Sequence, residues 1–228
     1  MNVFLWIKAH PLYLLLFLAT IFGYFCLSEN RKRLGIKEPM AALLALVHTV
    51  VGVFSVKAFA FLESGDFSGM SLYGAVFFLP LVYYIGAKLT KRRVADVFDV
   101  FTFLTVFTLM LARINCLFGG CCLGKLVPWS DSVRWPTREL EIVFYVVLLF
   151  WFGRLSKKPR HSGKLYPLYM LSYGAFRFVV EWFRESENMW GFLHISHIWS
   201  LVAILVGASV YYKLSKRQTT GRTRREKR

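Results

Sequence analysis

Long apolar runs separated by short polar connections dominate this sequence. Seven segments are mostly apolar over roughly the 17–25 residues that a helix needs to cross a bilayer. They lie at about 11–27, 40–62, 71–89, 95–111, 139–155, 165–183 and 192–212. The pattern therefore predicts an all-α integral membrane protein with about seven transmembrane helices. Charged residues interrupt the fourth and sixth segments, at Asp96, Asp99, Arg177 and Glu181.

The polar connections carry their charge on alternate sides. Lysine and arginine gather at 31–37, 88–93, 154–160 and 213–228, whereas the connection 63–70 contains neither. Cytoplasmic connections carry such an excess of cations, so we expect a cytoplasmic C-terminus and, with seven spans, an outside N-terminus. We expect one membrane-embedded domain over 1–212 and a basic cytoplasmic tail over 213–228 that contacts anionic lipid.

Composition agrees with the membrane class. Hydrophobic residues make up 56% of the 228 residues, above the roughly 45–50% of soluble domains. The net charge of +16 is compatible with nucleic-acid binding. The cations are, however, concentrated in alternate connections, which favours a role in orienting the protein in the membrane, so we expect no nucleic-acid partner. The first apolar run has no cationic leader or small-residue cleavage site, so we expect it to be retained as a span.

One segment, Ala112–Lys125, does not continue the fourth apolar run as an ordinary span. It contains three cysteines, three glycines, Asn115 and Arg113. Polar backbone at membrane depth must be satisfied by protein or by a water-filled cavity, and an arginine there usually has a functional partner. We therefore expect the helix to break here and a polar ligand to bind on the outer side. Snorkelling of Arg113 to the interface is the alternative.

A second polar stripe lies in the sixth segment. Tyr173, Arg177, Glu181 and Arg184 follow one another at helical spacing, so they share one helix face. Arginine binds phosphate in a bidentate manner, and two arginines from different spans could hold a lipid phosphate between them. The alternative is a buried pair of Arg177 with Glu181 that only fixes helix packing.

The remaining candidate groups leave several interpretations open. Cys116, Cys121 and Cys122 could form a disulfide, pack as small residues or provide a thiolate beside Arg113. No histidine in the segment completes a four-ligand site, so neither a metal nor a cofactor is expected. The helix-start pattern before Glu139 and Glu141 predicts that these carboxylates cap the fifth span. Of the histidines, His48 lies inside the second span. We expect the others to be solvated at the membrane interface, namely His10, His161, His194 and His197. His194 and His197 are expected to share a helix face.

Four of these segments together resemble the prolipoprotein diacylglyceryl transferase family. Residues 112–125 are similar to its signature Gly-Arg-x-Gly-Asn-Phe-x-Asn-Gly-Glu-x-x-Gly-Arg, and residues 135–141 to His-Pro-(Ser/Thr)-Gln-x-x-Glu. The element Tyr-Gly-x-x-Arg-Phe-x-x-Glu-x-x-Arg is complete from Tyr173 to Arg184, and residues 69–75 resemble the segment that ends in His-Gly-Gly. The motifs occur in the family's order over about residues 65–190.

The resemblance implies a multi-pass enzyme of the bacterial cytoplasmic membrane. Its substrates would be phosphatidylglycerol and a preprolipoprotein, whose lipobox cysteine thiol receives the diacylglyceryl group as glycerol phosphate leaves. The catalytic residues implied are Arg113, Arg177 and Tyr73. Substrate binding is assigned to Glu181, Tyr173, Arg184, Gly120, Cys116, Cys121 and Glu141.

The sequence departs from the family's motifs, and five of these departures bear on the chemistry. Tyr73 replaces a histidine, Cys116 an asparagine and Cys121 a glutamate. Trp135 replaces a second histidine, and Arg138 replaces a glutamine. These changes keep two other hypotheses open: a paralogue with a different thiol or hydroxyl acceptor, and a non-catalytic protein that binds or transports phospholipid.

Overall fold

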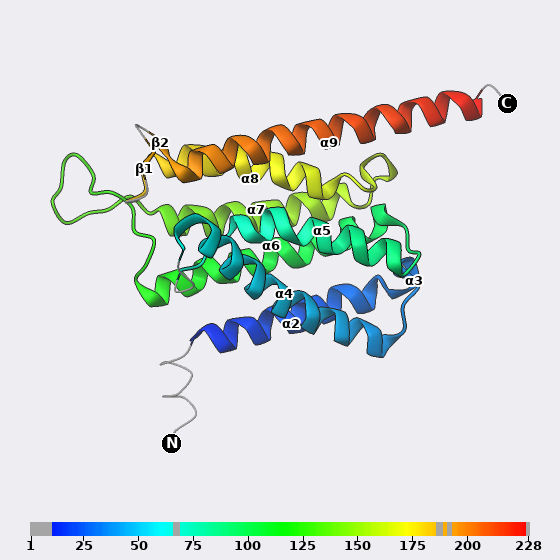
Figure 1. The fold of residues 1–228 in the computed structure, drawn as a ribbon, viewed down its shortest axis with the longest axis horizontal. Helices are drawn as coiled ribbons and strands as arrows, with labels where there is room; N and C mark the ends of the chain where they lie inside the picture. Colours follow the sequence, from blue (N-terminus) through cyan, green and yellow to red (C-terminus); the bar gives the residue numbers. More distant parts are fainter. Residues whose placement is uncertain (1–10, 66–68, 186–188, 191–192, 227–228) are drawn as a thin grey trace, which may run out of the picture.

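The computed structural model describes residues 11–65, 69–185, 189–190 and 193–226. Long helices lie side by side along one direction in these residues (Figure 1). They are α2 (Pro11–Glu29), α4 (Glu38–Ser64), α5 (Tyr73–Leu89), α6 (Val94–Gly119), α7 (Thr137–Leu155), α8 (Leu165–Glu181) and α9 (Ile195–Glu226). The short elements are α3 (Arg31–Leu34), the 3₁₀ turn η1 (Pro159–His161) and the two-residue strands β1 (Met189–Trp190) and β2 (Leu193–His194).

The described part of each of the seven apolar segments is mainly helical, and the protein is an all-α protein of membrane type. By length and composition, four described helices are able to cross a membrane: α2, α4, α6 and the part of α9 from Ile195 to Gln218, while α5 is a shorter apolar helix. Large apolar side chains cover the outside of the bundle, with Phe54 70% and Leu62 71% exposed. Such a surface is stable when lipid surrounds it.

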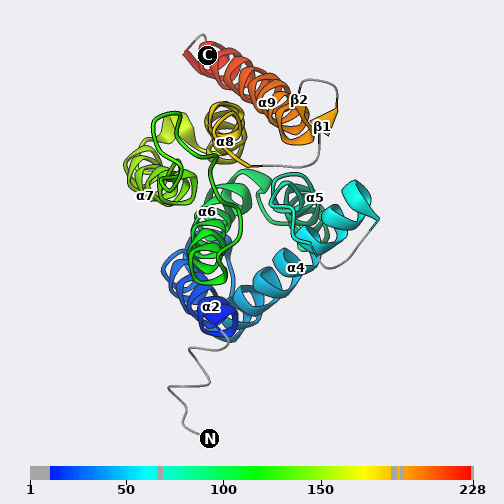
Figure 2. The same cartoon turned by 90° about the vertical axis from the view of Figure 1, so that its left-hand side faces the viewer.

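Helix α6 is the central helix of the bundle. It contacts α2, α4, α5, α7 and α8 (Figure 2). At one end, Asp96 and Asp99 bind Arg33, at 2.7 and 2.8 Å. Asp99 also accepts a hydrogen bond from the Gly163 amide at 2.8 Å. The carboxylates that interrupt the fourth apolar segment are therefore neutralised by a neighbouring helix and a turn.

The helix break expected at residue 112 is wrong. Helix α6 continues through Arg113 and Cys116 and ends at Gly119, where Gly120 adopts a left-handed conformation with φ 64°. A helix satisfies its own backbone at membrane depth, so a polar side chain does not have to interrupt it. The chain begins to reverse only after Gly119, at Gly120, and a glycine adopts positive φ without steric cost.

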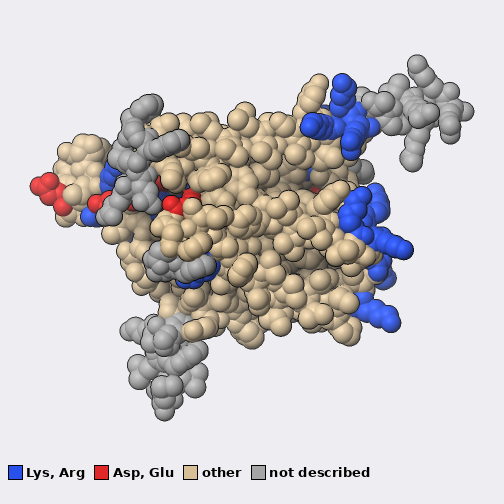
Figure 3. Space-filling model, viewed as in Figure 1, with Lys and Arg blue, Asp and Glu red and all other residues tan. Residues whose placement is uncertain are grey.

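Within the basic tail expected over 213–228, residues 213–226 belong to α9, which runs without interruption from Ile195 to Glu226. Lysine and arginine side chains gather at the end of the bundle that holds α3 and the end of α9, and acidic side chains are seen at the opposite end (Figure 3). The charge asymmetry read from the sequence is thus also an asymmetry of the folded protein.

Candidate functional site

Two arginines from different helices meet at one buried carboxylate. Glu141 of α7 binds Arg113 of α6 through Nε and Arg177 of α8 through Nη1, the latter at 2.8 Å. The three side chains are 2–6% exposed. Glu141 does not cap α7 as the helix-start pattern predicted, because its carboxylate is buried between the two guanidinium groups. Glu139, two residues nearer the helix start, is 49% exposed.

The network extends along α8 through a second buried carboxylate. Glu181 binds Arg177 Nη2 at 2.7 Å, lies 3.8 Å from Arg184 Nη1 and contacts His194 Nδ1 at 3.3 Å. Within this network three guanidinium groups face two carboxylates. Arg177 Nε and Arg184 Nε are buried and lack a hydrogen-bond partner among the described residues. The guanidinium groups of Arg177 and Arg184 thus carry N–H groups that no described residue accepts from.

A polar cavity of about 190 Å³ opens beside this network. It lies at the end of the bundle where α8 ends and α5 and α9 begin. Six of the predicted site residues line it: Tyr73, Arg113, Tyr173, Arg177, Glu181 and Arg184. Such a cavity, with cations on its walls, can accept the phosphate of a lipid headgroup.

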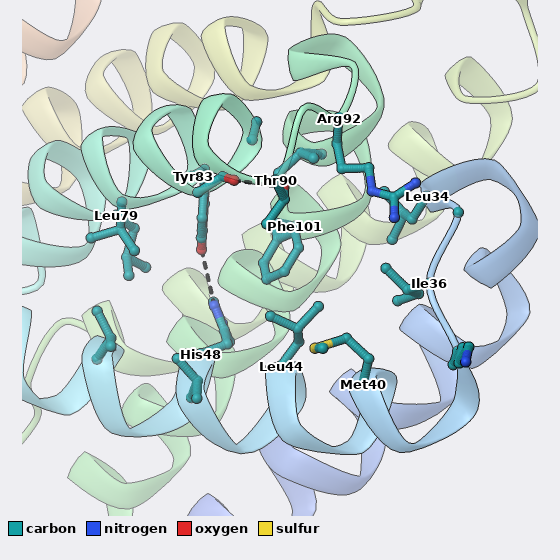
Figure 4. Close-up of a pocket in the computed structure, with 18 residues that line it drawn as sticks. Leu34, Ile36, Met40, Leu44, His48, Leu79, Tyr83, Thr90, Arg92 and Phe101 are labelled. Atoms are coloured by element: carbon teal, nitrogen blue, oxygen red, sulfur yellow. Dashed lines mark hydrogen bonds between the residues drawn. The ribbon is translucent and has the colours of Figure 1, made fainter.

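A second cavity, of about 370 Å³, is mainly apolar and lies between α4 and α5 (Figure 4). Its polar side chains are partly occupied with each other, because His48 Nδ1 contacts Tyr83 Oη at 3.0 Å and Tyr83 Oη contacts Thr105 Oγ1 at 2.8 Å. This cavity does not have the converging arginines of the polar one. The polar cavity is therefore the candidate functional site.

Tyr73 lies on the wall of the polar cavity, with its hydroxyl directed at α9. The hydroxyl donates a hydrogen bond to the Ser196 carbonyl at 2.8 Å and lies 2.8 Å from Ser200 Oγ. A phenolate has no proton to donate to a carbonyl, so this geometry favours the neutral phenol. Tyr73 thus fits a positioning role better than the role of a base.

The loop 120–136 is held against the end of α8. The Lys125 amide donates to the Phe183 carbonyl at 2.8 Å, and the Glu185 amide donates to the Leu123 carbonyl at 3.0 Å. These bonds bring Cys122 to the cavity wall, beside Arg113 and Arg184. Cys121, which stands at the family's glutamate position, is instead exposed.

Of the three interpretations left open for these cysteines, the disulfide is wrong, because Cys116, Cys121 and Cys122 are free thiols. Cys116 Sγ and Cys122 Sγ lie 3.8 Å apart, and Arg113 Nη1 lies 4.0 Å from the first and 3.6 Å from the second. The hydrogen bond from Cys116, together with the charges of Arg184 and Arg113, lowers the pKa of the Cys122 thiol. Burial and the neighbouring cations Arg177 and Arg113 lower the pKa of Arg184.

Three residues of the site were not among the predicted site residues. Glu63 of α4 and Cys122 line the cavity, and His194 binds Glu181. His194 and His197 are 5% and 1% exposed, so the interfacial solvation expected for them is wrong. They also do not share a helix face, because His194 ends β2 and its amide donates to His197 Nδ1 at 3.2 Å. The sequence considered Cys122 only as one of three neighbouring cysteines, with a disulfide, packing or a thiolate beside Arg113 left open.

The other predicted residues lie outside the cavity wall. Gly120 caps α6, Cys121 is exposed, Cys116 contacts Cys122, and Glu141 holds the two arginines together. His10 lies outside the described residues.

Comparison with known proteins agrees with the motifs. The sequence model of the prolipoprotein diacylglyceryl transferase family matches residues 7–213. Two similar relatives are phosphatidylglycerol–prolipoprotein diacylglyceryl transferases. The one from Pasteurella multocida is 34% identical over 62% of this chain and 58% of the relative. The one from Mannheimia succiniciproducens is 33% identical over 61% of this chain and 58% of the relative. A third, from Pseudoalteromonas translucida, is 29% identical over 68% of this chain and 63% of the relative.

The aligned part of the chain spans less than two thirds of the length of these relatives. The family match covers most of the chain, from the first apolar segment to the start of the basic tail, and it includes every residue of the polar cavity. This chain belongs to the prolipoprotein diacylglyceryl transferase family.

Proposed function

We propose that this protein transfers a diacylglyceryl group from phosphatidylglycerol to the thiol of a lipobox cysteine in a preprolipoprotein. The reaction forms a thioether and releases glycerol phosphate. The observation that carries the proposal is the buried network of Arg113, Glu141 and Arg177 beside a polar cavity, in a chain of this family.

The chemistry is a displacement at carbon by sulfur. Negative charge grows on the leaving phosphate as its bond to the glyceryl carbon breaks, and fixed cations stabilise that charge most when they are held in place before the reaction. The carboxylate of Glu141 holds Arg113 and Arg177, and the partnerless Nε groups of Arg177 and Arg184 can donate to the phosphate. This assigns the arginines to leaving-group stabilisation and Tyr173 and Glu181 to the wall that positions the donor.

We further propose that all seven long helices cross the bacterial cytoplasmic membrane as one domain, with the N-terminus outside and the basic C-terminal segment in the cytoplasm. Support comes from the cations at the end of the bundle opposite the polar cavity (Figure 3), because cationic connections remain in the cytoplasm. A reporter fused after residue 228 that is active only in the cytoplasm should be active. Activity of a reporter that works only outside the cytoplasm would indicate the opposite orientation.

Transfer of labelled phosphatidylglycerol to a lipobox peptide tests the function. Removal of one preorganised donor to a developing anion costs about 10²–10³-fold in rate, and we expect Arg177→Ala to lose at least that much. Arg177→Lys keeps the charge but not the planar fork, so its activity should be intermediate. The control is Arg154→Ala, at an exposed arginine near the end of α7, which should transfer normally.

Undiminished transfer by Arg177→Ala would overturn the assignment of the site. Consumption of phosphatidylglycerol without modification of the peptide would instead indicate a different acceptor. Binding of the lipid without any chemical turnover would indicate a non-catalytic protein.

A further inference from the structure

Three thiols converge where α6 ends beside the polar cavity. The Sγ atoms of Cys116, Cys121 and Cys122 all lie within 4.8 Å of one another, and each of these cysteines is a free thiol. Cys122 is on the cavity wall and Cys121 is exposed, so the cluster connects the cavity with the outside of the protein. The function proposed above leaves these side chains without a defined part in the chemistry.

The backbone brings the thiols together at a conformational cost. Gly120 ends α6 at φ 64°, and Cys122 adopts a left-handed conformation at φ 59°. For a residue with a side chain this conformation is strained. The chain thereby reverses within a few residues, and the Cys122 thiol comes within 3.8 Å of Cys116 on the last turns of α6.

The distance between these two sulfurs fits a shared metal ion. With zinc–sulfur bonds of about 2.3 Å, two thiolates of a tetrahedral site lie about 3.8 Å apart. The observed 3.8 Å between Cys116 Sγ and Cys122 Sγ equals this edge. Arg113 Nη1 faces both sulfurs, at 4.0 and 3.6 Å, and N–H donors to the sulfurs are the usual second layer of a thiolate site.

We propose that Cys116, Cys121 and Cys122 bind one thiophilic d¹⁰ cation, with Zn²⁺ as the first choice, and leave its fourth position open. Three protein ligands with an open fourth position are the arrangement of catalytic rather than structural zinc sites. Binding replaces three S–H bonds by three metal–sulfur bonds and releases three protons. The resulting site carries one negative charge, which Arg113 and Arg184 on the neighbouring cavity wall compensate.

The open position identifies a role that rests on the proposed function. A thiol that coordinates such a cation is deprotonated outright, and the thiolate is the nucleophile. The family's histidine is replaced here by Tyr73, whose proton is engaged with the Ser196 carbonyl. We assign activation of the acceptor thiol to the metal site instead.

The step balances without an oxidant or reductant. The acceptor thiol loses its proton to solvent as it becomes the fourth ligand. Its sulfur then forms the bond to the glyceryl carbon, and the carbon–oxygen bond breaks with its electron pair left on the phosphate oxygen. The product thioether is a neutral, weaker ligand, so it leaves the metal for the next acceptor.

Binding is tested on the reduced, purified full chain, independently of transfer. We expect one Zn²⁺ per chain by elemental analysis and, with Cd²⁺ as a spectroscopic substitute, a thiolate charge-transfer band. Serine at Cys116, Cys121 or Cys122 should weaken binding at least tenfold. Cys26→Ser, at the far end of the bundle, is the matched control and should bind normally.

Alkylation of the unaltered protein provides a readout that does not depend on variants. Zn²⁺ should protect Cys116, Cys121 and Cys122 together from a thiol reagent, as located by peptide mass analysis, and should leave Cys26 unprotected. Absence of stoichiometric metal, equal loss in Cys26→Ser, or protection of fewer than the three thiols would overturn the site.

The role is tested by metal removal in the transfer assay. A chelator should abolish transfer to the lipobox peptide, and Zn²⁺ but not Mg²⁺ should restore it. Full transfer by metal-free protein would overturn acceptor activation while the proposed function stands. Stoichiometric binding in a protein without any transfer would overturn the proposed function and its metal step but keep the binding site.

Discussion

Replacement of Glu141 by glutamine tests whether the carboxylate holds the two arginines in place. Glutamine keeps the size of the side chain but has one acceptor oxygen and a donor group in place of the second oxygen. In the native protein, the two carboxylate oxygens bind different arginines, Arg113 at Oε2 and Arg177 at Oε1. One guanidinium group must therefore face an amide donor, and the buried network gains one positive charge.

The expected magnitude follows from the burial of these groups. Glu141 is 2% exposed and its partners are 6% and 4% exposed, so water cannot replace the lost acceptor. Removal of one partner from a buried ion pair costs about 3–5 kcal/mol. The unfolding equilibrium constant should therefore rise about 10²- to 10⁴-fold.

Reversible unfolding in mixed detergent micelles measures this change, and Glu139→Gln is the matched control. Glu139 lies two residues earlier on α7, is 49% exposed and approaches Arg138 only to 3.9 Å. Exposed pairs contribute about 0–1 kcal/mol, so the control should be close to the unaltered protein. If the two variants lose the same stability, or if Glu141→Gln loses less than about 1 kcal/mol, the arginines are not held as described.

Two further predictions concern a close helix contact and a buried hydrogen bond. A Cβ at Gly74 would lie 2.0 Å from the Ser55 carbonyl oxygen. Gly74→Ala should therefore push α5 away from α4 and lower the free energy of unfolding by about 1–3 kcal/mol. The control is Gly86→Ala, where nothing lies within 4 Å of the added Cβ and the free energy of unfolding should rise by about 0.5–1 kcal/mol. Unfolding curves in detergent micelles measure the free energy of unfolding of both variants. A Gly74→Ala protein as stable as Gly86→Ala would contradict the close contact between α4 and α5. Tyr83→Phe removes the hydroxyl that contacts His48 at 3.0 Å and should cost about 1–3 kcal/mol by the same measurement; no change would mean that this buried pair does not contribute to stability.

The sequence predicted where the helices lie and how cations are distributed along the chain. Both are local properties, because an apolar run of bilayer length forms a helix whatever its neighbours are, and the charges stand in the connections. The spacing of Arg177 and Glu181 likewise placed them on one face of α8, where they are in contact at 2.7 Å. The prediction that Arg184 shares this helix face is wrong, because α8 ends at Glu181 and Arg184 pairs with Gly124 in an isolated bridge. The motif order identified the family.

The partners of these residues could not be predicted in the same way. Glu141 was open to interpretation as a cap because its partners, Arg113 and Arg177, lie 28 and 36 residues away in the sequence and meet only when α6, α7 and α8 pack. Burial of His194 depends in the same way on the distant contact with Glu181. Such contacts carry no signal in the local pattern of one sequence.

The cysteine segment combines the two kinds of information. Sequence alone determined that three thiols, glycines and an arginine occur together after an apolar run, and so that polar chemistry occurs near the end of this helix. Only the tertiary structure decided that Cys122 rather than Cys121 reaches the cavity. The reason is physical: the chain reverses through left-handed residues at Gly120 and Cys122, and the loop is held by hydrogen bonds to the end of α8, which is distant in sequence.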